Sequence, residues 1–253
     1  MLKSAFTILL AVSVVCLATT VYGAGIVVVD CNTTVHRAYF GFYGSQYFAD
    51  QPAKLFDDTV KWAVSSANPN STTVLLFTDN GTVNDYPANR YAIGFYDLLR
   101  TSGYNVLLDS RLKFAQRTNY SGINLVIYPN FDDRRADNVL TANIPFISME
   151  PGQSNEMNIG TGVAFTYPGG AVNRALVVDN GIQITNVYMN GQIIPMAYNG
   201  MPGTLYDIPT EGITIAGRGR ILVGEVPEPA TMTLVGAAAL ALLGLRRRRN
   251  RTP

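Results

Sequence analysis

The sequence has very few of the residues that build metal and redox sites. Its 253 residues include one histidine and two cysteines. A single histidine excludes a site with several histidine ligands. Only Cys31 lies outside the N-terminal apolar run, which excludes an internal disulfide or a cysteine-rich zinc site in the rest of the chain. We therefore expect no cofactor and no bound metal.

Charged residues are also scarce, at 15% of the chain, and they are unevenly distributed. Five of the arginines lie among the last eight residues. Without the two ends, residues 24–226 carry thirteen basic and seventeen acidic side chains, a net charge of −4. An acidic body lacks the positive field that attracts nucleic acid, so we expect no nucleic-acid partner.

The N-terminus has the three parts of a secretion signal. Lys3 supplies a positive charge, and Ala5–Ala18 is an uninterrupted apolar run. The more polar segment Thr19–Gly23 follows and ends on a small residue. The apolar run is short for a helix that crosses a bilayer. We therefore expect the secretion machinery to export the chain and cleavage to follow Gly23.

The C-terminus also has three parts. A short motif comes first and consists of Pro227, Glu228 and Pro229. The apolar segment Ala230–Leu245 follows, and as a helix it would be about 24 Å long, which is marginal for a bilayer core of about 30 Å. A basic cluster then consists of Arg246, Arg247, Arg248 and Arg249. Such a cluster stops translocation and stays on the cytoplasmic side.

This tail, over residues 226–253, resembles the PEP-CTERM sorting signal of Gram-negative bacteria that make exopolysaccharide. The resemblance implies cutting near the motif by exosortase, a membrane cysteine protease. It also implies a place in the cell envelope or extracellular matrix, with a C-terminal membrane segment before processing. Tails of this type are also called ice-binding protein C-terminal domains, although nothing in these residues implies ice binding. A permanent tail anchor is the alternative.

The first part of the body, residues 24–160, alternates apolar runs with helical patterns. Strands are predicted at residues 26–30, 73–78, 104–109, 123–128 and 144–149, and helices at 52–66, 88–101 and 134–141. Uniformly apolar strands separated by helices are typical of a mostly parallel sheet with helices on both faces, an α/β fold. The order resembles flavodoxin-like and class I glutamine-amidotransferase-like domains over residues 25–150.

The second part of the body, residues 161–225, changes to short alternating segments. Strands are predicted at residues 174–179, 182–189, 192–196, 213–216 and 220–223. Asn190-Gly191 is a favoured two-residue hairpin turn between two of them. We expect an antiparallel β extension that belongs to the same domain.

The motifs of two enzyme classes are missing. An amidotransferase needs a cysteine at the turn after strand 123–128, but Pro129-Asn130 stands there. The Gly-x-Ser-x-Gly turn of serine hydrolases is absent from the sequence. Cys31 and His36 are close in sequence, but no third group that would orient them can be named.

The segment Val27–Thr34 resembles the first motif of haloacid-dehalogenase-like phosphatases, an apolar strand ending in Asp-x-Asp-x-Thr, with Asp30 as nucleophile. The resemblance implies further site residues: Thr78 at the end of the next apolar strand, Lys113 as the charge-neutralising lysine, and Asp132 and Asp133 as Mg²⁺ ligands. Asn32 replaces the second aspartate, which protonates the leaving group, and an amide cannot supply that proton. A secreted Mg²⁺-dependent phosphohydrolase is therefore the alternative.

A second alternative is a glycan-binding module, because Tyr39–Tyr47 is rich in aromatic residues that can stack on sugars. Our main expectation is an exported body without catalytic residues, structural or binding in role and associated with exopolysaccharide.

Overall fold

The computed structural model describes most of the body. The described residues are 24–30, 34–42, 50–65, 68–83, 92–129, 135–167, 174–195, 197–199, 205–207 and 210–226. The predicted signal peptide and the tail from residue 227 onward lie outside them, as do Cys31, Asp132 and Asp133. Ala24–Glu225 forms one compact unit. Within the described ranges, no helix is long and apolar enough to cross a bilayer.

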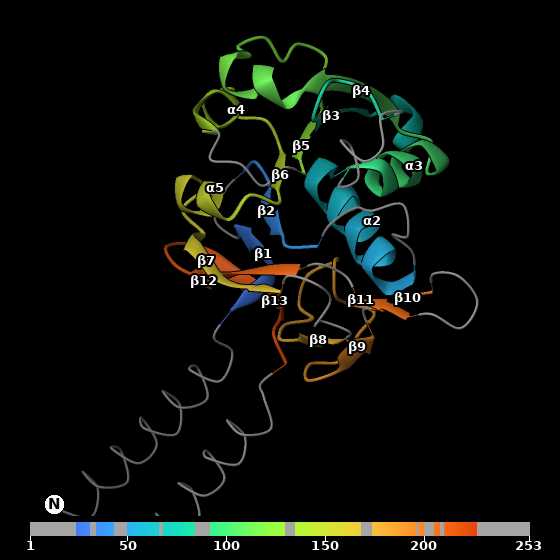
Figure 1. Cartoon of the computed structure of the whole chain (residues 1–253), viewed down its shortest axis with the longest axis vertical. Helices are drawn as coiled ribbons and strands as arrows, with labels where there is room; N and C mark the ends of the chain where they lie inside the picture. The colour runs from blue at the N-terminus through green and yellow to red at the C-terminus, as the bar shows by residue number, and fades with distance from the viewer. Residues whose placement is uncertain are drawn as a thin grey trace, which may run out of the picture. The chain divides into compact units, whose positions relative to one another are not determined.

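The chain alternates strands and helices up to residue 156 and is then described as strands and turns (Figure 1). The helices are α2 (Asp50–Val64), α3 (Ile93–Thr101), α4 (Asp137–Thr141), α5 (Pro151–Glu156) and the 3₁₀ helices η1 (Pro69–Ser71) and η2 (Arg111–Gln116). The first strands are β1 (Gly25–Asp30), β2 (Arg37–Phe40), β3 (Thr73–Thr78), β4 (Asn105–Ser110), β5 (Leu125–Tyr128) and β6 (Phe146–Ser148). The later strands are β7 (Gly160–Tyr167), β8 (Arg174–Val177), β9 (Ile193–Pro195), β10 (Ala197–Asn199), β11 (Leu205–Asp207), β12 (Thr210–Ile215) and β13 (Gly219–Gly224).

One mixed sheet joins the two parts of the body, in the order β4-β3-β5-β6-β2-β1-β13-β8-β9. The strands from β4 to β2 run parallel, and β1, β13, β8 and β9 continue the sheet with antiparallel pairing. β12 pairs with β1 and β7 off this path, and β10 with β11 forms a separate ribbon. The expected α/β fold with an antiparallel C-terminal extension is confirmed.

The inner parallel strands β3 and β5 are buried on both faces, which is why they are mostly apolar. In β3, Val74 and Leu76 belong to one core, whereas Leu75 and Phe77 belong to the other. Helices α2 and α3 supply apolar side chains to the first core, and η2 and α4 supply them to the second. Alternation with period two thus sends every second side chain to each helical layer.

The strand order is only partly that of a flavodoxin-like sheet. If β3 is counted first, β4-β3-β5-β6 follows the 2-1-3-4 order of such sheets, but the next place is held by β2, which precedes β3 in the chain. β1 was expected among the parallel strands and is instead antiparallel to β2. Residues 31–36, which join them, are too few for the crossover that a parallel pair needs, about a dozen residues or more.

The predicted strand at 182–189 is wrong, because this segment forms turns. Side chains compete there for the backbone: Thr185 Oγ1 donates to the carbonyl of Asp179 at 2.6 Å, and Asn180 Nδ2 donates to that of Tyr188 at 2.9 Å. Ile184 and Thr185 are both buried and Asn186 and Val187 are both exposed, which does not fit the alternation of a strand. Asn190-Gly191 therefore leads from these turns into β9, and β9 pairs with β8.

Helix α5 was not predicted, although its start has clear signals. Glu150 Oε1 accepts a hydrogen bond from the Gly152 N–H at 3.0 Å, and Pro151 occupies the first helical position. The predicted helix 52–66 is observed as α2, shifted by two residues, and the predicted helix 134–141 is described as α4 from Asp137.

Candidate functional site

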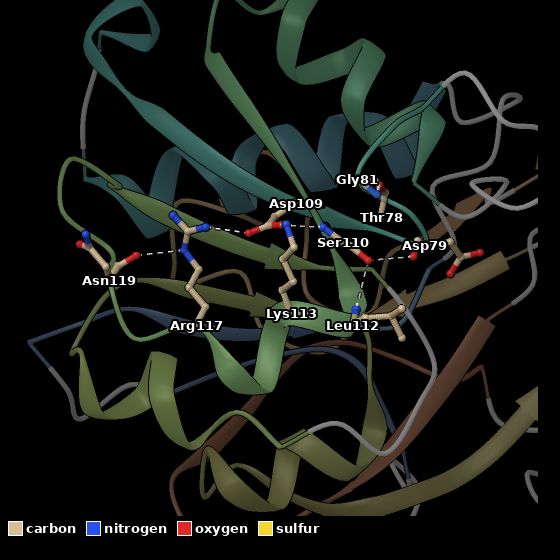
Figure 2. Close-up of polar contacts among 9 residues, drawn as sticks. All are labelled: Thr78, Asp79, Gly81, Asp109, Ser110, Leu112, Lys113, Arg117 and Asn119. Carbon is tan, nitrogen blue, oxygen red and sulfur yellow. Dashed lines mark hydrogen bonds and ion pairs between the residues drawn. The ribbon is translucent and has the colours of Figure 1, made fainter.

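The carboxyl ends of β3 and β4 carry a group of polar side chains (Figure 2). After β3 the chain turns, with Thr78 Oγ1 accepting from the Gly81 N–H at 3.0 Å. Gly81 has a φ of +82°, a conformation that glycine adopts without strain. The next side chain after β3, Asp79, pairs with Arg111 Nε of η2 at 2.8 Å. Ligands of open parallel sheets bind at this edge, which makes it the first place to examine.

Asp109, near the end of β4, is the centre of the second ion-pair group. Its Oδ2 lies 2.7 Å from Arg117 Nη1, and its Oδ1 lies 3.5 Å from Lys113 Nζ. Oδ1 also accepts from the Ser110 N–H at 2.9 Å. The Asp109 side chain is 13% exposed and that of Lys113 is 69% exposed. Figure 2 shows Asp109 between Arg117 and Lys113. With Asp79 and Arg111, the described residues of this edge include three cations and two carboxylates.

Ser110 connects these two groups through the backbone. Its hydroxyl donates to the carbonyl of Asp79 at 3.2 Å and accepts from the Leu112 N–H at 3.3 Å, which caps η2. A serine nucleophile needs a base that takes its proton, and a main-chain carbonyl cannot do so. In this arrangement Ser110 therefore orders the strand ends and does not act as a nucleophile.

Asp30 lies at the other edge of the sheet and is the buried partner of an ion pair. Its side chain is fully buried, and its Oδ2 lies 2.8 Å from Arg218 Nη2 on the turn between β12 and β13. Arg37, at the start of β2, donates through Nη2 to the carbonyl of Leu140 at 3.3 Å. Burial lowers the pKa of Arg37, the charge of Asp30 opposes this shift, and the charge of Arg218 adds to it. One buried carboxylate thus lies near two guanidinium groups.

The residues of the phosphatase-like motif are not brought together. Because β1 is antiparallel to β2, Asp30 lies level with the first residue of β2, at the amino ends of the parallel strands. Thr78 ends β3, at the carboxyl edge. Four strand spacings separate β1 from β3, roughly 19 Å. Lys113 pairs with Asp109, and Asp132 and Asp133 lie outside the described residues.

The other residues singled out in the sequence have structural contacts. His36 stacks on Trp62 at 4.2 Å between ring centroids, and its Nδ1 lies 2.6 Å from the carbonyl oxygen of Trp62. Tyr39, offered above as part of an aromatic sugar platform, is fully buried, and so are Phe40 and Phe42. The residues that follow, 43–49, lie outside the described residues. In the described ranges, no group of three or more histidine, cysteine, aspartate or glutamate side chains could hold a metal ion.

Several charged residues of these clusters were missed in the sequence: Arg37, Asp109, Arg111, Arg117 and Arg218. A signal existed for those on β4 and η2, because polar residues directly follow an apolar strand at Asp109–Arg111. No local signal links Arg218 to Asp30, since 187 positions separate them and only the pairing of β1 with β13 brings them together.

Comparison with protein families decides the nature of the tail. Residues 225–249 match the model of the PEP-CTERM protein-sorting motif. The C-terminal tail is a PEP-CTERM sorting motif. This motif implies an exported protein that is sorted to the envelope and processed by exosortase. The match begins at Glu225, the last residue of the compact unit, and otherwise covers the tail. Searches of curated proteins and of solved structures found no match.

Proposed function

We propose that the protein is an exported module of the cell envelope or extracellular matrix that associates with exopolysaccharide and catalyses no reaction. The PEP-CTERM motif supports the export and sorting of the chain. The separation of Asp30 from Thr78 and Lys113 is the observation that most supports a non-catalytic body, because phosphoryl transfer needs these groups around one phosphate.

The alternative phosphohydrolase is tested by turnover. Purified full-length protein in detergent is incubated with a chromogenic phosphate ester and Mg²⁺, beside an Asp30→Asn variant and an Asp109→Asn variant as matched control. We expect no turnover above the protein-free rate from any of them. Turnover that is lost in Asp30→Asn and kept in Asp109→Asn would overturn the proposal and establish the phosphohydrolase.

We assign the polysaccharide contact to the carboxyl edge of β3 and β4, where the described residues include three cations and two carboxylates. Lys113 is the most exposed of these cations, and an acidic sugar approaching from solvent meets it first. The interaction would be electrostatic and would weaken as salt screens it. A net charge of −4 on residues 24–226 opposes nonspecific attraction, so a local positive edge would direct the contact.

Retention on the polysaccharide of the producing cell tests this surface. Lys113→Glu should lower retention several-fold at low salt, and the difference should shrink at high salt. Lys54→Glu is the matched control, because Lys54 is also an ion-paired lysine, 45% exposed, but lies on α2. Equal loss in both variants would remove the carboxyl edge from the proposal, and full retention of Lys113→Glu would do the same.

A further inference from the structure

The beginning and the end of the body meet on one ladder. β1 and β13 pair in the interior of the sheet, with Gly25 opposite Gly224. One residue further out, the Glu225 N–H donates to the carbonyl of Ala24 at 3.2 Å. Ala24 directly follows the predicted signal cleavage site, and Glu225 is the first residue matched by the sorting motif. The two processing sites therefore adjoin opposite strands of the same ladder.

The N-terminal side of this ladder is closed. Ala24 is 3% exposed, and Gly25 and the rest of β1 are buried. A Cβ on Gly25 would lie 2.3 Å from Val28 Cγ2, and one on Gly224 would lie 3.1 Å from the carbonyl oxygen of Ala24. A protease binds its substrate as an extended strand on both sides of the cut. The residues after Gly23 are already committed to the sheet, so they are not available to it.

On the C-terminal side, the sequence does not allow the ladder to continue. The β13 strand ends at Gly224, and Val226 is only partly buried. The next residues include Pro227 and Pro229, which have no N–H to donate to a neighbouring strand. Proline therefore prevents the ladder from extending into the motif, whereas no such residue protects Ala24-Gly25 on the other strand. The two ends of the ladder therefore differ because of the residues that follow β13 and precede β1.

We infer that the two cuts have a fixed order: the signal peptide is removed before β1 closes on β13, and the tail is cut from the folded body. A chain that folds with its signal peptide attached becomes a poor substrate for the signal peptidase, because the cut then requires β1 to open. This inference rests on the proposed export and sorting, and it adds a requirement that the β1–β13 pairing imposes.

The first test uses the full-length chain, made without export and refolded in detergent micelles. Signal peptidase is added, and the loss of residues 1–23 is followed by intact mass. The matched variant carries a six-residue Gly-Ser linker between Gly23 and Ala24, which moves the cleavage site away from the ladder. We expect the folded natural chain to be cut at least about tenfold more slowly than the linker variant.

Equal rates for the two folded chains would overturn the inference while leaving export intact. If the linker variant is not cut either, the predicted signal peptide itself is wrong, and the inference falls with it. The second part of the inference is that the tail is cut from the folded body. It is tested in the producing cell with the same linker placed between Glu225 and Val226. Tail removal should proceed within about twofold of the natural rate, and a much faster removal would show that the folded body blocks that cut as well.

Discussion

Asp30 and Asp109 occur in similar settings at opposite edges of the sheet, and they differ in burial. Each lies at or near the end of a strand and near two cations. The Asp30 side chain is fully buried, whereas Asp109 is 13% exposed and its partner Lys113 is 69% exposed. A buried carboxylate that loses its charge leaves cations uncompensated in a medium of low polarity, but water replaces the contacts of an exposed pair. Burial, more than the number of ion pairs, therefore separates the structural cluster from the surface that can bind.

The largest effect is expected from Asp30→Asn. This change leaves Arg37 and Arg218 without their counter-charge and should lower the free energy of unfolding by about 3 kcal/mol. Urea unfolding of the purified protein measures it. The double change Asp30→Leu with Arg218→Met should cost less than the single change, because no charge is then left alone. A cost below about 1 kcal/mol for Asp30→Asn would contradict the claim that burial makes Asp30 more important for stability than Asp109.

The turn that holds Arg218 is the next most sensitive point. A Cβ on Gly219 would lie 2.1 Å from the carbonyl oxygen of Ile159, and a backbone atom cannot give way easily. Gly219→Ala should therefore lower the free energy of unfolding by about 2 kcal/mol. Gly152→Ala, on α5, meets only the Glu150 side chain at 3.2 Å and is the matched control. Equal stability of the two variants would contradict the close packing of this turn.

At the more exposed of the two clusters, Asp109→Asn should lower the free energy of unfolding by about 1 kcal/mol, because Arg117 and Lys113 remain partly hydrated after the change. Lys113→Gln should stay within about 0.5 kcal/mol of the natural protein. Both are measured by urea unfolding at low and high salt. A loss at Asp109 as large as that at Asp30 would mean that burial does not separate the two clusters.

The smallest effect is a pH dependence at the ion pair of Asp179 and Arg220. The hydrogen bond from Arg220 lowers the pKa of Asp179 below its ordinary value of 3.8, with burial opposing and the Gly181 N–H assisting. The stabilisation is thus present above pH 3.8 and is lost as the pH falls below it. Arg220→Gln should cost less than about 1 kcal/mol at pH 7. The cost should shrink at pH 3, and a cost that grows on acidification would refute this sign.

The sequence predicted the elements whose burial pattern is local. β3 and β5 are apolar on both faces, so their place inside a parallel sheet could be inferred from Thr73–Thr78 and from the 123–128 run. The direction of β1 could have been inferred from the short connection to β2, but β2 itself was not predicted. The strand prediction for 182–189 was wrong because apolar residues are frequent enough there for a strand, while side-chain hydrogen bonds to the backbone favour turns.

The candidate site was less predictable than the fold. Of the residues at the carboxyl edge of β3 and β4, Thr78 and Lys113 were named from the sequence, whereas Asp109 and Arg117 acquire their meaning only from contact with each other and with η2. Asp30 was noticed for its likeness to a nucleophile, and its true surroundings depend on Arg218, which the sequence places far away. Predicting contacts between distant segments requires the order of the strands in the sheet, and the local sequence pattern does not reveal that order.

The most direct test of the account is the intact mass of the protein recovered from the envelope and from the medium of its own cells. We expect a product that begins at Ala24 and lacks the residues after about Pro229, as export and sorting require. A product that still carries Met232–Pro253 would mean that the tail is a standing membrane anchor, and it would contradict the assignment of the body to the matrix.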